Sequence, residues 1–170
     1  AGADSITGGA GDDIITGGDG TDTFNVDSGT DTVNDLGGSS GGENDIVIIS
    51  AGATVNANNI VSFVATNATQ NNSTDAGNAV LTAKSGAGRT ISVANATGSS
   101  KAFTLVGSDG NDSLTGGAGD DIISVTSAGH ANADILDGGA GTDTLVLSSG
   151  THTLTSCLLY TSPSPRDLRK

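Results

Sequence analysis

The chain has 170 residues, of which 34% are hydrophobic and 27 are glycine, and it contains neither Trp nor Met. Its length suits one ordinary domain, but so few large apolar side chains argue against a large globular core. The formal net charge of -13 argues against nucleic acid and anionic lipid as partners, because like charges repel, and it favours divalent cations.

Eighteen of the 19 acidic residues are Asp and one is Glu. Short Asp side chains suit turns and ion ligation, whereas a merely solvated helical surface would favour Glu. No apolar run approaches the ~20 residues of a membrane span, and no amino-terminal signal pattern is visible. Composition alone would also fit a disordered acidic tail, so the order of the residues has to decide.

A nine-residue cycle organises the first array, residues 1–36. The phrase GGAGDDIIT at 8–16 returns as GGDGTDTFN at 17–25, and the acid in its sixth slot recurs every nine residues. An apolar residue stands two places after each acid. The acids are Asp4, Asp13, Asp22 and Asp31, and the apolar residues are Ile6, Ile15, Phe24 and Val33. Asp45 with Val47 fits one more degenerate cycle after a five-residue insertion.

The middle segment, residues 37–106, contains short apolar runs separated by Asn, Gly, Ser and Thr, which predict β-strands joined by turns. The runs are DIVIIS at 45–50, NIVSFVA at 59–65, NAVLTA at 78–83, RTISVAN at 89–95 and AFTLVG at 102–107. No segment has a convincing 3.6-residue period, so almost no helix is expected. Residues 67–78 are predicted to form a mobile loop.

The cycle returns in the second array, residues 107–156. Its sixth-slot acids are Asp112, Asp121, Asp134 and Asp143, followed by Leu114, Ile123, Leu136 and Leu145 in the apolar slot. The step between the second and third acids is thirteen residues instead of nine. Four extra residues within VTSAGHANA, residues 125–133, must therefore bulge out if the register is kept.

The tail, residues 157–170, differs in composition from the rest: it holds both prolines, the only Tyr, the only Cys and three of the six basic residues. Its CLLYTSPSPRD resembles the translation of a transposase sequencing adapter. We interpret the tail as non-native, with a genuine linker as the alternative, and we assign Cys157 no role. Ala1 falls in the third slot of a cycle, so we expect that both ends are truncated and that the parent protein is longer.

The cycle itself predicts a coiled geometry. Glycine at slots one, two and four is expected to let the backbone turn through positive φ and to expose its carbonyls. The last three residues form a minimal strand with one side chain pointing inward. Two nonapeptides then make an eighteen-residue coil, and stacked coils lie ~4.8 Å apart, as neighbouring strands do.

This geometry predicts a cation between the acids. Asp4 would lie beside Asp22, and Asp13 beside Asp31, where two carboxylates repel by roughly 1 kcal/mol even in water. Ca²⁺ fits because it takes about six to eight oxygen ligands and accepts carboxylates and carbonyls alike. Soft ligands are missing, which argues against zinc and copper.

The GGxGxDxUx nonapeptides at 2–34 and 107–146 resemble the calcium-binding β-roll of the RTX (repeats-in-toxin) exoproteins. The resemblance implies an all-β fold in which parallel β-roll or β-helix solenoid segments flank the β-rich middle segment. It also implies Ca²⁺ held by sixth-slot Asp and turn carbonyls. The Asp pairs would be Asp4 with Asp22, Asp13 with Asp31, Asp112 with Asp134, and Asp121 with Asp143. The carbonyls would lie around Gly8, Gly9, Gly11, Gly17, Gly18, Gly20, Gly116, Gly117, Gly119, Gly138, Gly139 and Gly141.

Several positions are expected to contribute less. The glycine-poor turn before Asp31 and the HANAD turn before Asp134 depart from the pattern and are expected to bind weakly or not at all. The fifth-slot acids Asp12 and Asp120 are predicted to be solvent-facing charges. The two histidines, His130 and His152, have no His or Cys at ligand spacing, so they are predicted to lie on the surface.

The expected function follows from the ion. One apolar side chain per half-turn is too little to overcome chain entropy and acid repulsion, so folding should be coupled to Ca²⁺ binding. Extracellular modules bind Ca²⁺ at about 10⁻⁴ to 10⁻³ M, so this module should order only outside the cell. In RTX proteins that switch accompanies type I secretion, a one-step export guided by a carboxy-terminal signal.

We therefore expect an extracellular calcium-dependent folding module of a secreted toxin-like or adhesin-like exoprotein. A surface-layer or adhesin protein assembled by Ca²⁺ and the non-catalytic tail of a secreted hydrolase are the alternatives. No HExxH or SxxK motif occurs, so the chain is not expected to be an enzyme. Calcium ions are the expected partners, with self-association or a cell-surface polysaccharide as further candidates; nucleic acid is not expected.

Overall fold

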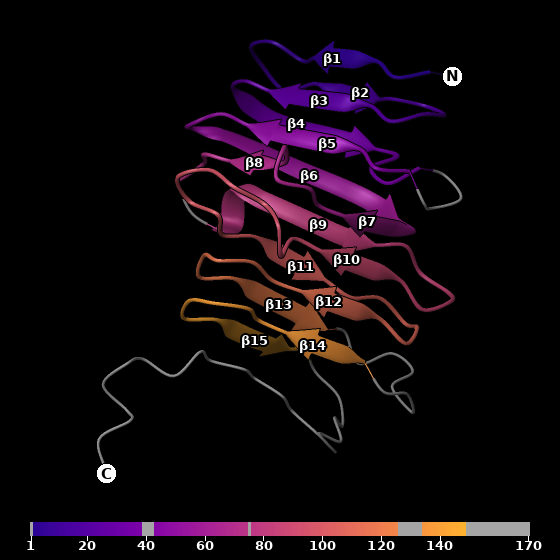
Figure 1. Cartoon of the computed structure of the whole chain (residues 1–170), viewed down its shortest axis with the longest axis vertical. Helices are drawn as coiled ribbons and strands as arrows, with labels where there is room; N and C mark the ends of the chain where they lie inside the picture. The colour runs from indigo at the N-terminus through magenta and orange to yellow at the C-terminus, as the bar shows by residue number, and fades with distance from the viewer. Residues whose placement is uncertain (1, 39–42, 75, 126–133, 149–170) are drawn as a thin grey trace.

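Short parallel strands stacked one on the next form the framework of the described part of the chain (Figure 1). The structure, a computed structural model, describes residues 2–38, 43–74, 76–125 and 134–148. Within those ranges the one helical element is a single 3₁₀ turn, and no helix could cross a membrane. The predicted all-β class and near absence of helix are confirmed.

Fifteen strands and the 3₁₀ turn follow one another along the described residues. They are β1 (Ser5–Thr7), β2 (Ile14–Thr16), β3 (Thr23–Val26), β4 (Gly29–Asn34), β5 (Ile46–Ile49), β6 (Ala53–Ile60), β7 (Ser62–Val64), β8 (Gln70–Asn71), η1 (Ala76–Asn78), β9 (Ala79–Ala83), β10 (Thr90–Ser92), β11 (Thr104–Val106), β12 (Ser113–Thr115), β13 (Ile122–Val125), β14 (Ile135–Asp137) and β15 (Thr144–Leu147).

The strands form three parallel sheets. A seven-stranded sheet, β15-β13-β11-β9-β6-β4-β2, runs the length of the stack. A four-stranded sheet, β1-β3-β5-β8, accompanies its amino-terminal part, and a second one, β14-β12-β10-β7, accompanies the rest. Because successive strands alternate between sheets, the chain winds as a β-solenoid, and the middle segment continues the winding instead of interrupting it.

The strand register confirms the predicted coil. Ser5 pairs with Thr23 and Ile14 with Thr32, each eighteen residues later. In the second array Ile122 pairs with Thr144, twenty-two residues later, so the register survives the four extra residues. Residues 126–133, where the bulge is predicted, lie outside the described residues.

Two strands in the middle segment were not predicted. Strand β6 buries Ala53, Val55 and Ala57 and turns Thr and Asn outward, so its small inward side chains left no strongly apolar run. The prediction of a loop at 67–78 is wrong in part, because β8 and η1 lie within it. The five predicted strands are confirmed as β5, β7, β9, β10 and β11.

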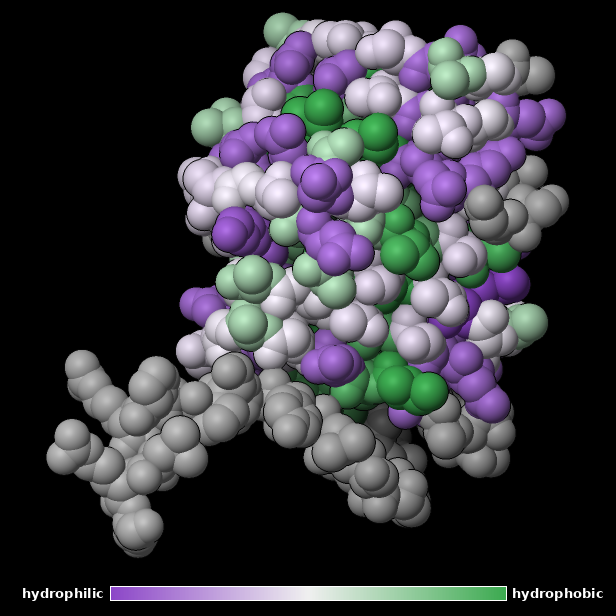
Figure 2. Space-filling model, viewed as in Figure 1, coloured by the Kyte–Doolittle hydropathy of each residue, from purple (hydrophilic) through white to green (hydrophobic). Residues whose placement is uncertain are grey.

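The core runs along the axis of the solenoid and includes residues of both arrays and of the middle segment. All three Phe side chains, Phe24, Phe63 and Phe103, are buried, which confirms Phe24 as a core residue. Figure 2 shows hydrophilic and neutral residues over much of one face, with an apolar patch at its lower end. The strands at that end of the stack carry exposed Ile135, Val146 and Leu147.

Candidate functional site

Sixth-slot acids lie in columns along the stack, joined by their own backbones. The amide of Asp4 donates to Oδ1 of Asp22 over 2.8 Å, and the amide of Asp13 donates to Oδ1 of Asp31 over 3.1 Å. The same bond links the second-array pairs Asp112 with Asp134 at 2.9 Å and Asp121 with Asp143 at 3.0 Å. All four predicted pairs are thus brought together in adjacent coils.

Three carboxylate oxygens in the first array are buried without a hydrogen-bond donor. They are Oδ2 of Asp13, Asp22 and Asp31, which find no partner within the described part of the chain. Asp22 and Asp31 have no solvent exposure at all. A buried charged oxygen without a partner is strongly unfavourable, so each of these atoms calls for a cation.

Two of the three oxygens face the same point beside Gly8. A methyl group placed on Gly8 would lie 3.0 Å from Oδ2 of Asp31 and 3.1 Å from Oδ2 of Asp13. The space is therefore bordered by two anionic oxygens from adjacent coils. Hard oxygen donors in this arrangement suit Ca²⁺, which accepts mixed carboxylate and carbonyl ligands.

Side chains alone do not complete a metal site. Among the described residues, no three His, Cys, Asp or Glu side chains are grouped so that they could hold a metal ion. A site at Asp13 and Asp31 must therefore take further ligands from the backbone. Slot-four carbonyls do point along the stack: the oxygens of Gly2 and Gly11 lie against Gly20 and Gly29 of the next coil.

The glycines serve two different purposes. In the first array, slots two and four have positive φ, with +97° at Gly9 and +110° at Gly11, as predicted. The prediction of positive φ at slot one is wrong for Gly8 and Gly17. A Cβ on Gly17 would collide with the Asp22 carboxylate, so slot one is glycine to make room for the acid.

In the described part of the second array, slots two and four have positive φ only in the last cycle, so that prediction is wrong for Gly117 and Gly119. A Cβ on Gly116 would nevertheless lie 2.6 Å from Oδ2 of Asp121, so slot one makes room for the acid here too. Gly139 and Gly141 have φ of +86° and +134°, whereas Gly116, Gly117 and Gly119 stay outside the positive region. A Cβ on Gly138 would collide with the Asp143 carboxylate, as at Gly17.

Two acids of the second array have both oxygens occupied by donors. Oδ2 of Asp112 accepts from the Ser108 amide at 2.6 Å and from the Ser108 hydroxyl at 3.2 Å. Oδ2 of Asp121 accepts from the Gly117 amide at 2.6 Å. Burial raises the pKa of Asp121 to about 6, with a further contribution from the charge of Asp143.

Two acids next to the first array accept amide hydrogen bonds from its coils but were not among the predicted ligands. Asp45 is fully buried and accepts from the amides of Asp22 at 2.8 Å and Gly37 at 2.7 Å; burial raises its pKa. Glu43, the only Glu, accepts from the Gly20 amide at 3.2 Å through Oε1. The five-residue insertion before Asp45 was the sequence signal from which both acids could have been added to the predicted ligands.

The remaining predictions concern residues outside the acid columns. Asp12 and Asp120 are exposed, as predicted, and each accepts an amide hydrogen bond of 2.8 Å from the next coil, from Thr30 and Thr142 respectively. His130, His152, Cys157 and most of the HANAD turn lie outside the described residues.

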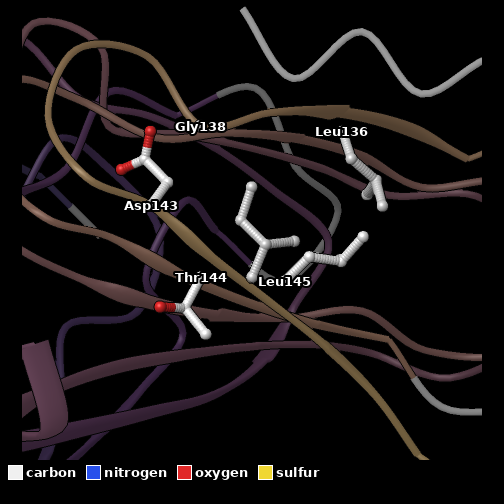
Figure 3. Close-up of a pocket in the computed structure, with 6 residues that line it drawn as sticks. Leu136, Gly138, Asp143, Thr144 and Leu145 are labelled. Atoms are coloured by element: carbon white, nitrogen blue, oxygen red, sulfur yellow. The ribbon is translucent and has the colours of Figure 1, made fainter. Parts of the chain in front are cut away.

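An apolar pocket lies between the last described coils, and Asp143, a member of the acid columns, is among the residues that line it. It is lined by Ile123, Leu136, Gly138, Asp143, Thr144 and Leu145. Figure 3 shows the Asp143 carboxylate pointing away from the two leucines. The pocket therefore offers apolar contacts at the end of the core and no cluster of reactive groups.

Comparison with known proteins agrees with the geometry. The family model of the RTX calcium-binding nonapeptide repeat, in four copies, matches residues 1–33, 104–128 and 126–151. A search of curated proteins and a search of solved structures found no match. The matched residues contain all four acid pairs. The chain therefore contains calcium-binding nonapeptide repeats of the RTX family.

Proposed function

We propose that Ca²⁺ bound between adjacent coils drives folding of the two arrays and stabilises a secreted exoprotein of toxin-like or adhesin-like type. The observation that carries the proposal is the set of three buried carboxylate oxygens without donors, at Asp13, Asp22 and Asp31. Unless a cation is present, folding must bury this charge uncompensated.

The Asp13 and Asp31 carboxylates, together with turn carbonyls near Gly8, would hold one ion. The corresponding pairs Asp4 with Asp22, Asp112 with Asp134, and Asp121 with Asp143 would hold others. The bound ion supplies positive charge that offsets the repulsion within each column. The chain supplies the spacing, because parallel pairing fixes each acid one coil from the next.

The proposed setting is extracellular. RTX repeat proteins are typically secreted, and extracellular calcium modules bind at about 10⁻⁴ to 10⁻³ M. At cytosolic calcium levels the arrays would therefore stay largely unfolded, and they would order after export. The proposal divides the chain at residues 36, 106 and 156. Calcium-dependent arrays then lie on either side of a middle segment that lacks the nine-residue cycle.

We assign the chain no catalytic role. β-Rolls of this family are typically structural, and the described pocket joins apolar side chains to a single carboxylate. Calcium ions are the proposed partners, with self-association or binding to a cell-surface polysaccharide as further candidates.

The test is far-UV circular dichroism of the chain during titration with CaCl₂, with MgCl₂ as the control. A cooperative gain of β-structure specific to Ca²⁺, weakened by Asp13→Ala with Asp121→Ala, supports the proposal. A spectrum that does not change on addition of Ca²⁺ overturns it, whether that spectrum is of a disordered chain or already shows full β-structure in chelator.

A further inference from the structure

The same eight residues, GGAGDDII, occur at 8–15 and at 116–123 and adopt two conformations. In the first copy, Gly9 and Gly11 have φ of +97° and +110°. In the second copy, the equivalent Gly117 and Gly119 lie outside the positive region. Local sequence cannot cause this difference, so the surroundings of each turn must select it.

The two conformations treat the sixth-slot carboxylate differently. In the second copy the slot-two amide, Gly117 N–H, donates to Oδ2 of Asp121 at 2.6 Å. In the first copy Oδ2 of Asp13 receives no hydrogen bond from any described residue. Ser108 and Asp112 repeat the pattern of the second copy at 2.6 Å. We name the turns at 107–112 and 116–121 closed, because their own backbone caps the acid.

In two other repeats an additional acid takes the slot-two amide. The Gly18 amide donates to Oδ2 of Asp35 at 3.0 Å, and the Gly139 amide donates to Oδ1 of Asp137 at 3.1 Å. Both glycines have positive φ, at +91° and +86°. With its slot-two amide held by Asp35, the turn at 17–22 leaves Oδ2 of Asp22 buried without a donor among the described residues.

Asp35 is itself held in an unfavourable conformation. Its φ is +80°, which costs free energy for any residue with a Cβ. Its carbonyl accepts from the Gly38 amide at 2.9 Å while its side chain reaches Gly18. The backbone is thus shaped so that this carboxylate can compete for the Gly18 amide.

We propose that the slot-two amide is a switch at these calcium sites: the site is closed when the amide caps its own sixth-slot Asp and open when it does not, as where Asp35 withdraws the Gly18 amide. The inference rests on the proposed function. The open turns of the first array present free carboxylates and bind Ca²⁺ at lower concentration. The closed turns at Asp112 and Asp121 must first break an amide hydrogen bond, so they bind later. Asp35 acts as a positioning residue for the site at Asp22.

The test combines calorimetric titration with CaCl₂ and two-dimensional NMR of the glycine amides in the full chain. The wild type should bind in two phases, and the Gly117 amide should shift only in the second. Asp13→Asn should remove ions from the first phase, and Asp121→Asn, in an identical octapeptide, from the second. One phase, or equal effects of the two variants on both phases, overturns the switch while leaving calcium binding intact.

The positioning role has its own variant and control. Asp35→Ala should raise the Ca²⁺ concentration needed for the first phase roughly fivefold, the effect of one lost hydrogen bond, and should leave the second phase unchanged. Asp19→Ala removes an exposed acid from the same turn and should shift neither phase. Equal shifts from both variants would show that only net charge matters and would overturn the role of Asp35. Absence of any calcium binding in the wild type would overturn the proposed function itself.

Discussion

The amide of Asp13 donates to the carboxylate of Asp31 eighteen residues later, while the second oxygens of both side chains face Gly8 without donors among the described residues. One oxygen of Asp31 thus fixes the register of the coils, and the other is left for a cation. Because the two oxygens of Asp31 have different roles, substitutions can affect folding and calcium binding separately.

Asp31→Asn is predicted to matter only when calcium is present. The amide side chain keeps an oxygen for the Asp13 amide and replaces the orphaned oxygen by a neutral donor, which removes the buried charge. In chelator the variant should be at least as stable as the wild type. In Ca²⁺ it should lose roughly 1 to 3 kcal/mol relative to the wild type. Urea denaturation in Ca²⁺ and the far-UV circular dichroism signal in chelator measure the difference, and equal stability in Ca²⁺ would contradict it.

Asp45→Asn is predicted to lower stability whether or not calcium is present. Both Asp45 oxygens already accept backbone amides, from Asp22 and Gly37, so an amide nitrogen in one position would face another donor. The variant should be destabilised by about 1 to 3 kcal/mol in chelator as well as in Ca²⁺. The same denaturation series compares it with Asp31→Asn. Loss of stability in Ca²⁺ alone would place Asp45 among the calcium ligands instead.

Gly17→Ala is predicted to disrupt the turn although φ at Gly17 is not positive. The added Cβ would collide with the Asp22 carboxylate, so either the acid or the coil must move. We expect a loss of about 1 to 3 kcal/mol in the presence of Ca²⁺. Ala10→Ser, at the exposed third slot of the preceding repeat, is the matched control and should change stability little. Equal melting temperatures for both variants and the wild type would refute the steric explanation.

The pH dependence in chelator should run against the usual acid sensitivity of proteins. The pKa of Asp121 is raised from 3.8 to about 6, so the folded chain binds more protons than the unfolded chain between those values. The contribution to stability is therefore full below about pH 4 and is lost as pH rises through 6. Far-UV circular dichroism in calcium-free buffer should show less β-structure as the pH rises through 4.5, 5.5 and 6.5, and Asp121→Asn should flatten the trend. Rising stability over this range would contradict the burial of Asp121.

The middle segment should retain structure at calcium levels that unfold the arrays. Val55, Leu81 and Leu105 are fully buried in neighbouring strands β6, β9 and β11, and the described residues from 46 to 108 contain no buried acid. Hydrogen exchange in chelator should therefore be slower in β9 than in β2. Uniformly fast exchange would show that the whole solenoid, and not only the arrays, depends on Ca²⁺.

The periodic parts of this fold could be predicted from the sequence because each repeat carries its own register. The spacing of Asp4, Asp13, Asp22 and Asp31 gave the coil length, and the structure pairs Ser5 with Thr23 accordingly. The middle segment lacked such a marker. Its strand β6 fills the core with Ala and Val between Asn and Thr, a pattern with too little apolar contrast to stand out.

The state of each carboxylate could not be predicted, because it depends on contacts between coils. Identical octapeptides leave Asp13 without a donor and cap Asp121 with Gly117. Asp35 and Asp137 accept hydrogen bonds from slot-two amides, although neither occupies the sixth slot, where the cycle places its acid. Sequence spacing fixes which acids become neighbours, whereas the surrounding coils decide which of their oxygens remain available.

The most direct test is a crystal structure of the chain grown in CaCl₂, with an anomalous difference map calculated around the acid columns. The account predicts an ion between Asp13 and Asp31, within about 2.3 to 2.6 Å of Oδ2 of each, with carbonyl oxygens completing its coordination. An intact solenoid with no anomalous density beside Gly8, and with both carboxylates bound to water, would contradict it.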